Sequence, residues 1–287
     1  GPSFSFLERK EKEAKRKELL DNWGYIMPIQ QICTVASMEQ LDDSTWWMVL
    51  EVGRLVSEHG LRGGQFLHVK CGDDQLLRRP ISVAITGQDE PEDLVTLIFE
   101  VRGAGTKWLS RRKAGDKLDV LGPLGNGFDV SKEGRYLLAG GGIGVPPLIE
   151  YGESLKWPRT AVLGFRTKDK AFPAIVSRFK EHCGETYICT DDGTLGRHGF
   201  VDSQVRDVLV KDNNFTAILA CGPEPMLKSV AKAAAEFGVP CQVSMEERMG
   251  CGVGACLVCA TPMKDGTMKH VCKDGPVFNA EEVDWDA

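Results

Sequence analysis

The sequence predicts a multidomain protein in which an antiparallel β-barrel is followed by an α/β domain with a doubly wound parallel sheet and by a small C-terminal module. Three observations predict this order. Short β-rich runs between Gly, Asp and Pro turns fill residues 29 to 129, and apolar runs alternate with helical segments from residue 134 onward. Four of the ten cysteines then cluster between residues 251 and 272. At 287 residues and 42% hydrophobic content, the chain is long enough for about two domains.

The expected boundaries follow these changes in texture. We expect an N-terminal helical extension over 1–28, the barrel over 29–130, the α/β domain over 131–245 and the cysteine module over 246–287. Within the extension, residues 8–20 lack Gly and Pro and pair Glu with Lys at i,i+4, which predicts a solvated helix. A docking arm for a partner subunit is the alternative interpretation.

The period of the apolar residues and the residue composition predict the individual strands and helices. The clearest barrel strands are expected at 45–52, 64–71 and 94–102, where β-branched and aromatic residues gather. The sheet strands are expected at 135–142, 160–165, 186–193, 216–223 and 241–245, and the helices at 145–157, 173–181, 201–210 and 224–238.

Charge and hydropathy exclude several classes of function. The net charge of −6 and the pI near 5.5 leave no basic stripe for nucleic acid. The sequence contains no apolar run of the roughly 18 to 20 residues that a membrane span needs, and its start lacks the apolar core of a secretory signal. We therefore expect a cytoplasmic protein that binds neither nucleic acid nor membrane. Clustered cysteines in such a compartment favour a metal site over disulfides.

The clustered cysteines have a specific spacing. Cys251, Cys256, Cys259 and Cys272 read C-x4-C-x2-C-x12-C, and the first three match the loop of plant-type [2Fe-2S] ferredoxins. Glycines at 250, 252 and 254 permit positive φ and close approach to the cluster sulfurs. Structural zinc or plain thiols are the alternatives, but zinc sites usually have two pairs of closely spaced cysteines, whereas this loop has one C-x2-C pair among three cysteines. The module is thus predicted to be a [2Fe-2S] module. The cysteines predicted to be packing residues are Cys33, Cys71, Cys183, Cys189 and Cys241.

A glycine-rich turn stands between a predicted strand and a predicted helix. Gly140, Gly141, Gly142 and Gly144 would let the backbone approach a pyrophosphate at the helix N-terminus. Because Pro147 replaces the third glycine of the usual fingerprint, a tight structural turn stays open as an alternative. A second turn of this kind, at 220–227, indicates a ligand crevice at the carboxyl ends of the strands.

A nicotinamide nucleotide and an iron–sulfur cluster in one chain require a carrier that converts between two-electron and one-electron transfer. Nicotinamide exchanges a two-electron hydride, whereas a [2Fe-2S] cluster takes one electron at a time, so we expect a flavin between them. Residues 78–84 place Arg79 and Ser82 at a strand edge, and residues 103–110 run from a glycine-rich loop into a helix. Both suit a flavin and its phosphates, although Arg79 alone would be interpreted as a surface ion-pair residue.

The order of these motifs resembles the ferredoxin-NADP reductase superfamily, and within it the electron-transfer subunits of B-type dihydroorotate dehydrogenases. The resemblance covers about residues 29–285 and is most specific at "VCKDGPVF", 271–278. It implies a subunit that passes electrons from an FMN-containing catalytic dihydroorotate dehydrogenase subunit through [2Fe-2S] and FAD to NAD, in pyrimidine biosynthesis. It also implies a hetero-oligomer, by resemblance a heterotetramer. The chain itself is not expected to oxidise dihydroorotate, and no catalytic acid–base pair is expected.

The resemblance also implies site residues. FAD would be bound by Arg79, Pro80, Ile81, Ser82, Ile98, Phe99, Glu100, Gly105 and Thr106. The nicotinamide nucleotide would face Gly140, Gly141, Gly142, Gly144, Asp192, Gly193, Cys221, Gly222 and Pro223. The cluster would be held by Cys251, Cys256, Cys259 and Cys272.

Two questions stay open at the level of sequence. Arg166, Lys168 and Lys170 stand where an acidic residue would hold the ribose of NAD, so NADP is possible. Glu246 and Glu247 either lie near the flavin–nicotinamide junction or form an exposed turn.

Two further functions compete with the main hypothesis. One is the same FAD and [2Fe-2S] architecture serving a ferredoxin:NAD(P) transhydrogenase or a hydrogenase. The other is a zinc-stabilised nucleotide-binding regulator without enzymatic activity.

Overall fold

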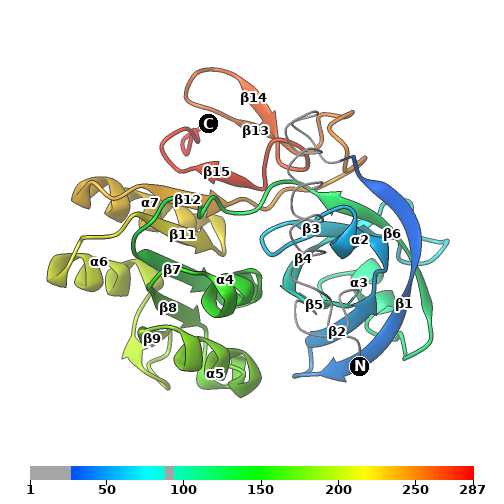
Figure 1. The fold of residues 1–287 in the computed structure, drawn as a ribbon, viewed down its shortest axis with the longest axis horizontal. Coiled ribbons are helices and arrows are strands. Elements are labelled where there is room, and N and C mark those ends of the chain that lie inside the picture. Colours follow the sequence, from blue (N-terminus) through cyan, green and yellow to red (C-terminus); the bar gives the residue numbers. More distant parts are fainter. Residues whose placement is uncertain (1–26, 88–93) are drawn as a thin grey trace, which may run out of the picture.

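The structure, a computed structural model, describes residues 27–87 and 94–287. The helix expected over 8–20 lies outside these ranges. Figure 1 shows the barrel and the parallel sheet side by side, with the C-terminal segment carrying β13 to β15 placed across one end of both. Within the described residues, no helix combines the length and the apolar character needed to cross a bilayer.

The first body is a closed barrel of antiparallel strands in the order β1-β2-β5-β4-β3-β6. The strands are β1 (Ile29–Gln40), β2 (Thr45–Glu51), β3 (Phe66–Val69), β4 (Arg79–Thr86), β5 (Leu94–Glu100) and β6 (Lys117–Leu124). Short helices α2 (Arg54–Ser57) and α3 (Ala104–Leu109) follow β2 and β5. This confirms the predicted barrel.

The side chains of β3 divide between two cores because a strand alternates its faces. Leu67 and Val69 point into the barrel, where they pack with residues such as Leu50. Phe66, two residues from His68, instead packs with residues of the parallel sheet and of the C-terminal segment. The outer face of β3 therefore supports the rest of the molecule.

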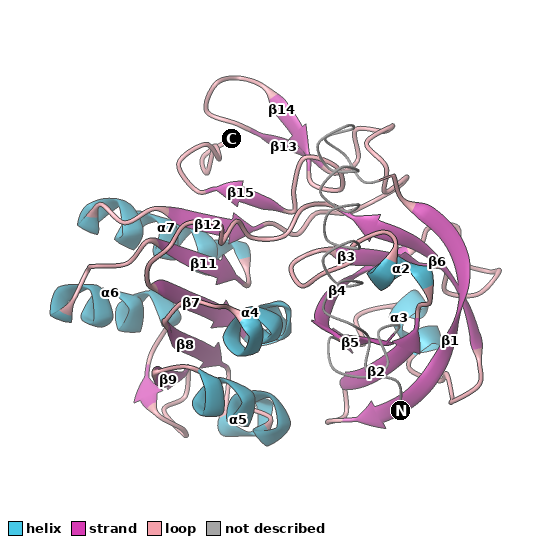
Figure 2. Ribbon diagram, in the orientation of Figure 1, coloured by secondary structure: helices cyan, strands magenta, loops and turns pink. Residues whose placement is uncertain are grey.

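The second body is a seven-stranded sheet in the order β10-β9-β8-β7-β11-β12-β15. Its strands are β7 (Tyr136–Gly141), β8 (Arg159–Phe165), β9 (Glu185–Thr190), β10 (Arg197–His198), β11 (Ala217–Cys221), β12 (Cys241–Ser244) and the antiparallel β15 (Val277–Asn279). Its helices are α4 (Ile149–Ser154), α5 (Pro173–His182), α6 (Val201–Lys211) and α7 (Glu224–Phe237). Figure 2 shows these helices flanking the strands.

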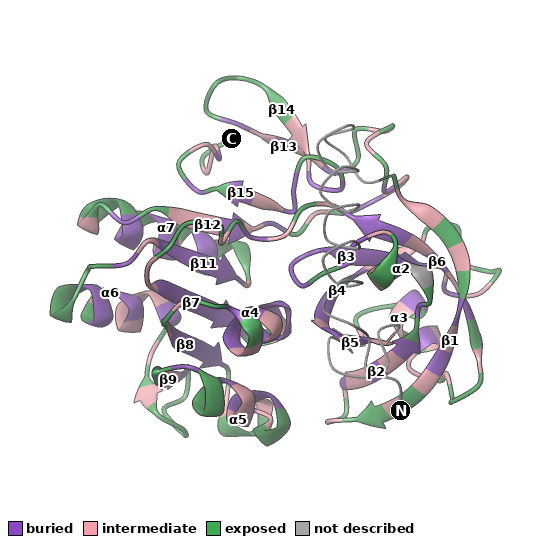
Figure 3. Cartoon of the chain, viewed as in Figure 1, coloured by how far each residue is buried: buried purple, intermediate pink, exposed green. Residues whose placement is uncertain are grey.

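Alternate residues of the central strands serve opposite faces, as a doubly wound sheet requires. Leu137 of β7 packs against α6 and α7, whereas Leu138 packs against α4 and α5. Both are fully buried, and Figure 3 shows β7, β8 and β11 almost wholly buried.

The helix expected over 145–157 is shorter than predicted. Two 3-10 turns, η1 (Gly142–Gly144) and η2 (Pro146–Leu148), precede α4, which ends at Ser154. Adjacent prolines at 146 and 147 lack backbone N–H groups and restrict the residues before them, so a regular α-helix begins only after Leu148.

The C-terminal segment is tied to the sheet. Its strand β15 pairs antiparallel with β12, so residues from 277 onward extend a sheet that otherwise ends with β12. A hairpin of β13 (Ala260–Pro262) and β14 (Met268–His270) projects beside it.

Hydrogen bonds of α4 fix the barrel against the sheet. The carboxylate of Glu150 accepts the N–H of Gly63 at 2.9 Å and both the N–H and the hydroxyl of Thr86 at 2.9 and 2.8 Å. The next residue, Tyr151, donates its hydroxyl to the carbonyl of Gly63 at 2.9 Å. These contacts hold the barrel and the sheet in one relative position.

Candidate functional site

The four clustered cysteines come together in the C-terminal segment. Amides of the loop converge on two of them: the N–H groups of Val253 and Ala255 point at Cys251 Sγ at 3.4 and 3.3 Å, and that of Gly254 points at Cys272 Sγ at 3.2 Å. Such donors are what an iron–sulfur site directs at its sulfurs.

Thiol–thiol hydrogen bonds join two pairs, Cys251 with Cys256 and Cys259 with Cys272, and the charge of Cys251 also acts on Cys272 across these pairs. Among the described residues, no three ligands of the His, Cys, Asp or Glu type surround one point that could hold a single ion. Two pairs of thiols suit a binuclear cluster, in which each iron takes two cysteines, better than a mononuclear zinc site.

The loop amides also set the acidity of the first cysteine. Partial burial by itself raises the pKa of Cys251, but the hydrogen bonds from the Val253 and Ala255 amides, with that from Cys256, outweigh it and lower this pKa to about 6. Burial and the neighbouring Cys259 raise the pKa of Cys272 to about 12. A thiolate is the metal-binding form, so the loop prepares Cys251 for ligation.

Glycines shape the loop, as predicted. Gly252 and Gly254 have φ of +76° and +75°, in the left-handed region that favours glycine. A Cβ on Gly252 would stand 2.6 Å from His68 Nδ1, and one on Gly254 would stand 2.7 Å from the Lys273 side chain. Gly250 has no positive φ, but a Cβ there would lie 3.3 Å from Cys256 Sγ.

His68 is the site residue that sequence reasoning missed. It lies on β3 opposite Pro80 of β4, is fully buried, and touches the cluster loop at Gly252. Burial, together with the charge of Arg78, lowers its pKa to about 4, so the ring is neutral at pH 7. A histidine in the alternating run "FLHV" gives no signal in the sequence that distinguishes it from an ordinary strand residue.

The predicted FAD residues lie on two strands that separate from each other. β4 and β5 pair only from Val83 opposite Leu97 to Thr86 opposite Val95. Beyond that point, residues 79–82 pair with β3 and residues 98–100 pair with β2. The facing edges of 79–82 and 98–100 are thus unpaired with each other, and an edge of unpaired backbone groups is suited to hydrogen-bond a flat heterocycle.

The side chains on these strands differ in exposure. Ser82 is exposed and Pro80 is half-buried on the outer face, whereas Ile81 and Phe99 pack inside the barrel. Ile98 packs with the core of the sheet. Contacts of Ile81, Ile98 and Phe99 with a flavin would therefore come from their backbone.

Arg79 meets the N-terminal turn of α3. A Cβ on Gly105 would stand 2.6 Å from the Arg79 Nε, so the absence of a side chain at 105 makes room for the guanidinium. Arg79 donates to Gln75 Oε1 at 3.0 Å and to the carbonyl of Leu77. The hydroxyl of Thr106 is used locally, since it accepts the N–H of Arg102 at 2.9 Å.

A cavity of about 320 Å³ lies beside Arg79, between the loop after β3 and α3. Lys107 of α3 and Arg111 just after it contribute positive charge to its wall, Asp73 and Asp74 contribute negative charge, and Trp108 contributes an aromatic face. The residues that line it are Cys71, Gly72, Asp73, Asp74, Gln75, Ala104, Lys107, Trp108 and Arg111. Its position beside α3, the basic side chains of Lys107 and Arg111 and the face of Trp108 suit one end of a dinucleotide. Sequence reasoning missed Lys107 and Arg111.

The glycine loop and the second turn meet at the carboxyl ends of adjacent strands. β7 and β11 are parallel neighbours, with Gly140 opposite Cys221. A Cβ on Gly144 would lie 2.4 Å from the carbonyl oxygen of Cys221, so the two turns are packed backbone to backbone. Gly142 has φ of +55° and open space around it, which leaves that turn accessible. This is the edge at which open α/β sheets bind ligands.

Asp192 and Gly193 lie at the same edge, after β9, which β8 separates from β7. Asp192 is exposed, and hydrogen bonds from the hydroxyl and N–H of Thr194 hold its pKa below the ordinary value. A larger cavity of about 490 Å³ lies at the opposite edge, near Arg135 and Glu185 at the amino ends of the strands, away from every predicted site residue.

The basic residues after β8 differ in whether they form an ion pair or stay exposed. Lys170 donates to Asp42 and, at 3.0 Å, to Ser44 in the β1–β2 turn. Partial burial by itself would raise the pKa of Asp42, but its hydrogen bonds with Lys170, Ser44 and Thr45 hold the pKa well below its usual range. Arg166 and Lys168 stay exposed.

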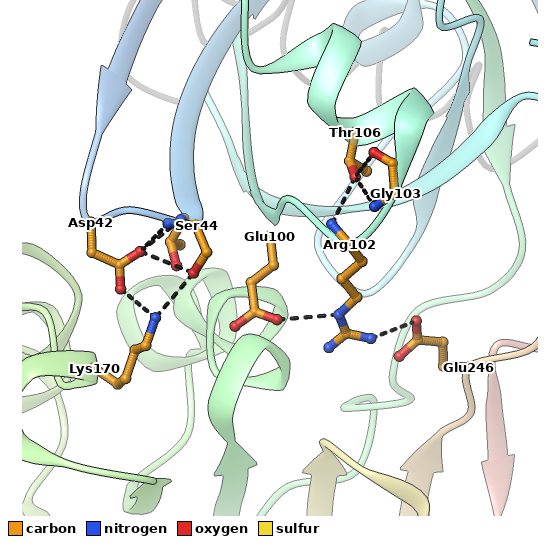
Figure 4. A network of polar contacts seen from close by, with 9 residues as sticks. Asp42, Ser44, Glu100, Arg102, Gly103, Thr106, Lys170 and Glu246 are labelled. Carbon is orange, nitrogen blue, oxygen red and sulfur yellow. Dashed lines mark hydrogen bonds and ion pairs between the residues drawn. The ribbon is translucent and has the colours of Figure 1, made fainter.

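Figure 4 shows Lys170 held in this way, and beside it a second network in which Arg102 joins β5 to the C-terminal segment. Its guanidinium lies 3.2 Å from Glu100 and 3.5 Å from Glu246. Glu246 is three-quarters exposed, whereas burial raises the pKa of Glu247. The turn before the cluster loop is thus anchored next to the predicted FAD strand.

A closed barrel beside a doubly wound sheet, with a cysteine loop attached, defines a ferredoxin reductase-like protein. A family model described as the iron-sulfur cluster binding domain of dihydroorotate dehydrogenase B matches residues 246–284. Dihydroorotate dehydrogenase B (NAD(+)), electron transfer subunit, of Bacillus pumilus is 44% identical over 260 residues, covering 87% of this chain and 96% of its own. The protein of the same description from Bacillus velezensis is 43% identical, covering 87% and 97%. The chain belongs to this family of electron transfer subunits.

A solved structure gives a second relative. A chain of the NADH-dependent reduced ferredoxin-NADP oxidoreductase, studied for flavin-based electron bifurcation, superposes with a TM-score of 0.78 at 34% identity. The match covers 88% of this chain and 90% of that one. The architecture is therefore shared with an oxidoreductase of a different description.

Proposed function

We propose that this chain is the electron-transfer subunit of an NAD-dependent dihydroorotate dehydrogenase. In this role it takes electrons from an FMN-containing catalytic subunit and passes them through a [2Fe-2S] cluster and FAD to NAD. The observation that carries the proposal is the contact between the cysteine loop and the barrel, where Gly252 touches His68 on the strand paired with β4. A reducing, cytoplasmic location suits the ten free thiols.

The cluster would be held by Cys251, Cys256, Cys259 and Cys272. The amides of Val253, Gly254 and Ala255 favour the thiolate forms, and two of the cysteines are buried. The chain thereby excludes water from part of the cluster.

FAD would lie along the separated edges of β4 and β5. Arg79, backed by Gly105, would pair with the phosphates, and Ser82 would face the ring system from the exposed side of β4. Lys107 and Arg111 would add charge at the far end of the dinucleotide. The other predicted residues, Pro80, Ile81, Ile98, Phe99, Glu100 and Thr106, would contribute mainly backbone and shape.

The nicotinamide nucleotide would lie over the carboxyl ends of β7 and β11. Gly140, Gly141, Gly142 and Gly144 would approach its phosphates, and Cys221, Gly222 and Pro223 would border the nicotinamide. Asp192 and Gly193 would contact its other half. We favour NAD because the dihydroorotate dehydrogenase B relatives are named for NAD(+). Lys170, one of the three basic residues near a possible 2′-phosphate, is committed to Asp42, whereas Arg166 and Lys168 stay exposed.

A bound flavin would supply the conversion between paired and single electrons. The protein then needs no acid–base group: its residues bind, orient and shield the carriers. Glu150 and Lys170 fix the distance between the two bodies through hydrogen bonds, and Arg102 anchors the cluster segment next to β5.

The catalytic partner would dock over the cluster loop. Leu257 is 75% exposed and Val258 52% exposed, directly between Cys256 and Cys259, and Val253 is 38% exposed. Exposed apolar side chains beside a redox site are typical of a partner surface. A heterotetramer of two subunits of each kind is the assembly we propose.

The test is purification of the full chain with and without its co-expressed catalytic subunit. We expect flavin absorbance, about two irons per chain, NADH oxidation with an artificial acceptor by the chain alone, and NAD-linked dihydroorotate oxidation only in the complex. Strong dihydroorotate oxidation by the chain alone would refute the subunit role. Leu257→Asp should keep its iron and lose the partner on a sizing column.

A second candidate is the corresponding subunit of a reduced ferredoxin:NAD(P) oxidoreductase, favoured by the 34% identical chain of that complex. Reduction of NADP by reduced ferredoxin in a native complex, with no dihydroorotate activity, would establish it instead. The higher identity to the dihydroorotate dehydrogenase B subunits supports the first proposal.

A further inference from the structure

His68 is a buried polar group whose ring finds no partner in the described protein. The residue is fully buried, yet neither Nδ1 nor Nε2 makes a hydrogen bond there. The backbone of Arg78 lies close enough to raise the pKa of the ring slightly against the effect of burial, but it satisfies neither ring nitrogen. An unmade hydrogen bond at a buried group costs about 1–3 kcal/mol, so an unpaired imidazole in a core implies a partner that the protein chain does not provide.

The ring is directed at the cluster loop. Its Nδ1 lies 2.6 Å from where a Cβ of residue 252 would stand, and residue 252 follows Cys251 directly. A side chain at this position is excluded both by the ring and by the φ of +76°. The amides of Val253 and Ala255 point at Cys251 Sγ from the same loop. The loop that carries Cys251 thus has amide donors at the sulfur and the imidazole of His68 against the residue that follows it.

The other side of His68 is the predicted flavin strand. Its cross-strand partner is Pro80 of β4, and its neighbour Phe66 on the same face packs with Cys259 and Cys272 in one apolar cluster. His68 thus stands between the strand assigned to FAD and the loop assigned to the cluster.

We propose that neutral His68 donates a hydrogen bond from Nδ1–H to a sulfur of the bound [2Fe-2S] cluster, at the Cys251 side, and so raises the cluster's reduction potential. The hydrogen bond stabilises the reduced cluster more than the oxidised one, because the extra electron increases the negative charge on the sulfurs. The couple is one electron with no proton, since the Nδ1 proton stays on the ring in both oxidation states. His68 would act on the cluster by direct contact, and this role rests on the proposed cluster binding.

The test compares His68→Leu, which removes the donor, with His68→Asn, whose amide N–H can replace Nδ1–H. Each full chain is loaded with FAD and cluster, and its cluster potential is measured by EPR-monitored redox titration at one fixed pH. We expect His68→Leu to lower the potential by an amount equal to about a tenfold change in equilibrium constant, about 59 mV for one electron. His68→Asn should restore most of this shift, and the flavin potential should not move.

The outcomes separate this inference from the proposed function. If wild-type chain holds no iron, the cluster proposal fails. If wild type holds the cluster and both variants keep its potential, the role of His68 is refuted.

If the variants lose iron, the hydrogen bond is tested in wild-type protein labelled with ¹⁵N-histidine, by measuring the hyperfine coupling of the label to the reduced cluster. His270 stands two residues before Cys272 and could give the same signal, so the measurement is repeated in labelled His270→Gln. A ¹⁵N hyperfine coupling to the reduced cluster that persists there supports the hydrogen bond, and its absence overturns it.

Discussion

Cys259, in the cluster loop, and Cys189, on β9 of the parallel sheet, are equally hidden from solvent, with exposures of 1% and 0%. Their surroundings differ. Burial raises the pKa of Cys189 to about 11, as it raises those of Cys71 and Cys183, and the charged groups that act on Cys189 are Arg197, Asp202 and Asp207 rather than thiols. Cys259 instead faces Cys272, while loop amides point at the sulfurs of Cys251 and Cys272. Burial alone therefore says little about what a cysteine does, and the neighbouring donors and thiols decide it.

The most direct way to break this comparison is to remove one cysteine from each region. Cys259→Ala should abolish cluster binding, with iron falling from about two per chain to near zero, whereas Cys189→Ala should keep the full iron content. Iron analysis and the visible spectrum of anaerobically purified protein measure both. Equal iron in the two variants would remove Cys259 from the ligand set.

Alkylation of the iron-free chain sharpens the contrast. Cys251 has a lowered pKa of about 6, so most of it is thiolate at pH 7, and its rate with iodoacetamide should fall about tenfold between pH 7 and pH 5. Cys189, with a pKa raised to about 11, should stay unmodified over this range. Peptide mapping by mass spectrometry gives the rates, and equal labelling at the two positions would contradict the prediction.

Substitutions at two glycines distinguish the effect of backbone strain from the effect of close packing against a neighbouring side chain. Gly252 and Gly266 both have left-handed φ, +76° and +81°, but only Gly252 lies against another group, His68. Gly252→Ala should shorten the lifetime of the cluster in air several-fold, and Gly266→Ala should leave it within twofold while costing about 1 kcal/mol of stability. Restored lifetime in Gly252→Ala with His68→Ala would show that the ring causes the effect.

The smallest expected effect is in the barrel. Cys33 is 1% exposed in the barrel core, and burial raises its pKa. Cys33→Ala should lower the free energy of unfolding by about 1 kcal/mol through lost packing, without a change in iron or flavin content. Chemical denaturation measures the stability, and a loss of iron would mean that the barrel cysteines also influence the cluster site.

The glycine turns, the cysteine spacing and the strand–helix alternation were readable from sequence because each is a local pattern. The spacing of Cys251, Cys256 and Cys259 and the glycines around them limit the chemistry of the loop before any fold is known. The apolar runs of β7 and β11 predict buried parallel strands in the same way.

Only the tertiary structure decided which of these patterns meet. His68 and Gly252 are far apart in sequence, and no pattern in either segment predicts their contact. The commitment of Lys170 to Asp42, and the separation of β4 from β5 that opens the edges of 79–82 and 98–100, also depend on long-range packing. Local sequence sets backbone preference and ligand type, because these depend on neighbouring residues. Which group a buried side chain contacts depends instead on how apolar faces from distant parts of the chain pack together. This packing decides which segments lie side by side.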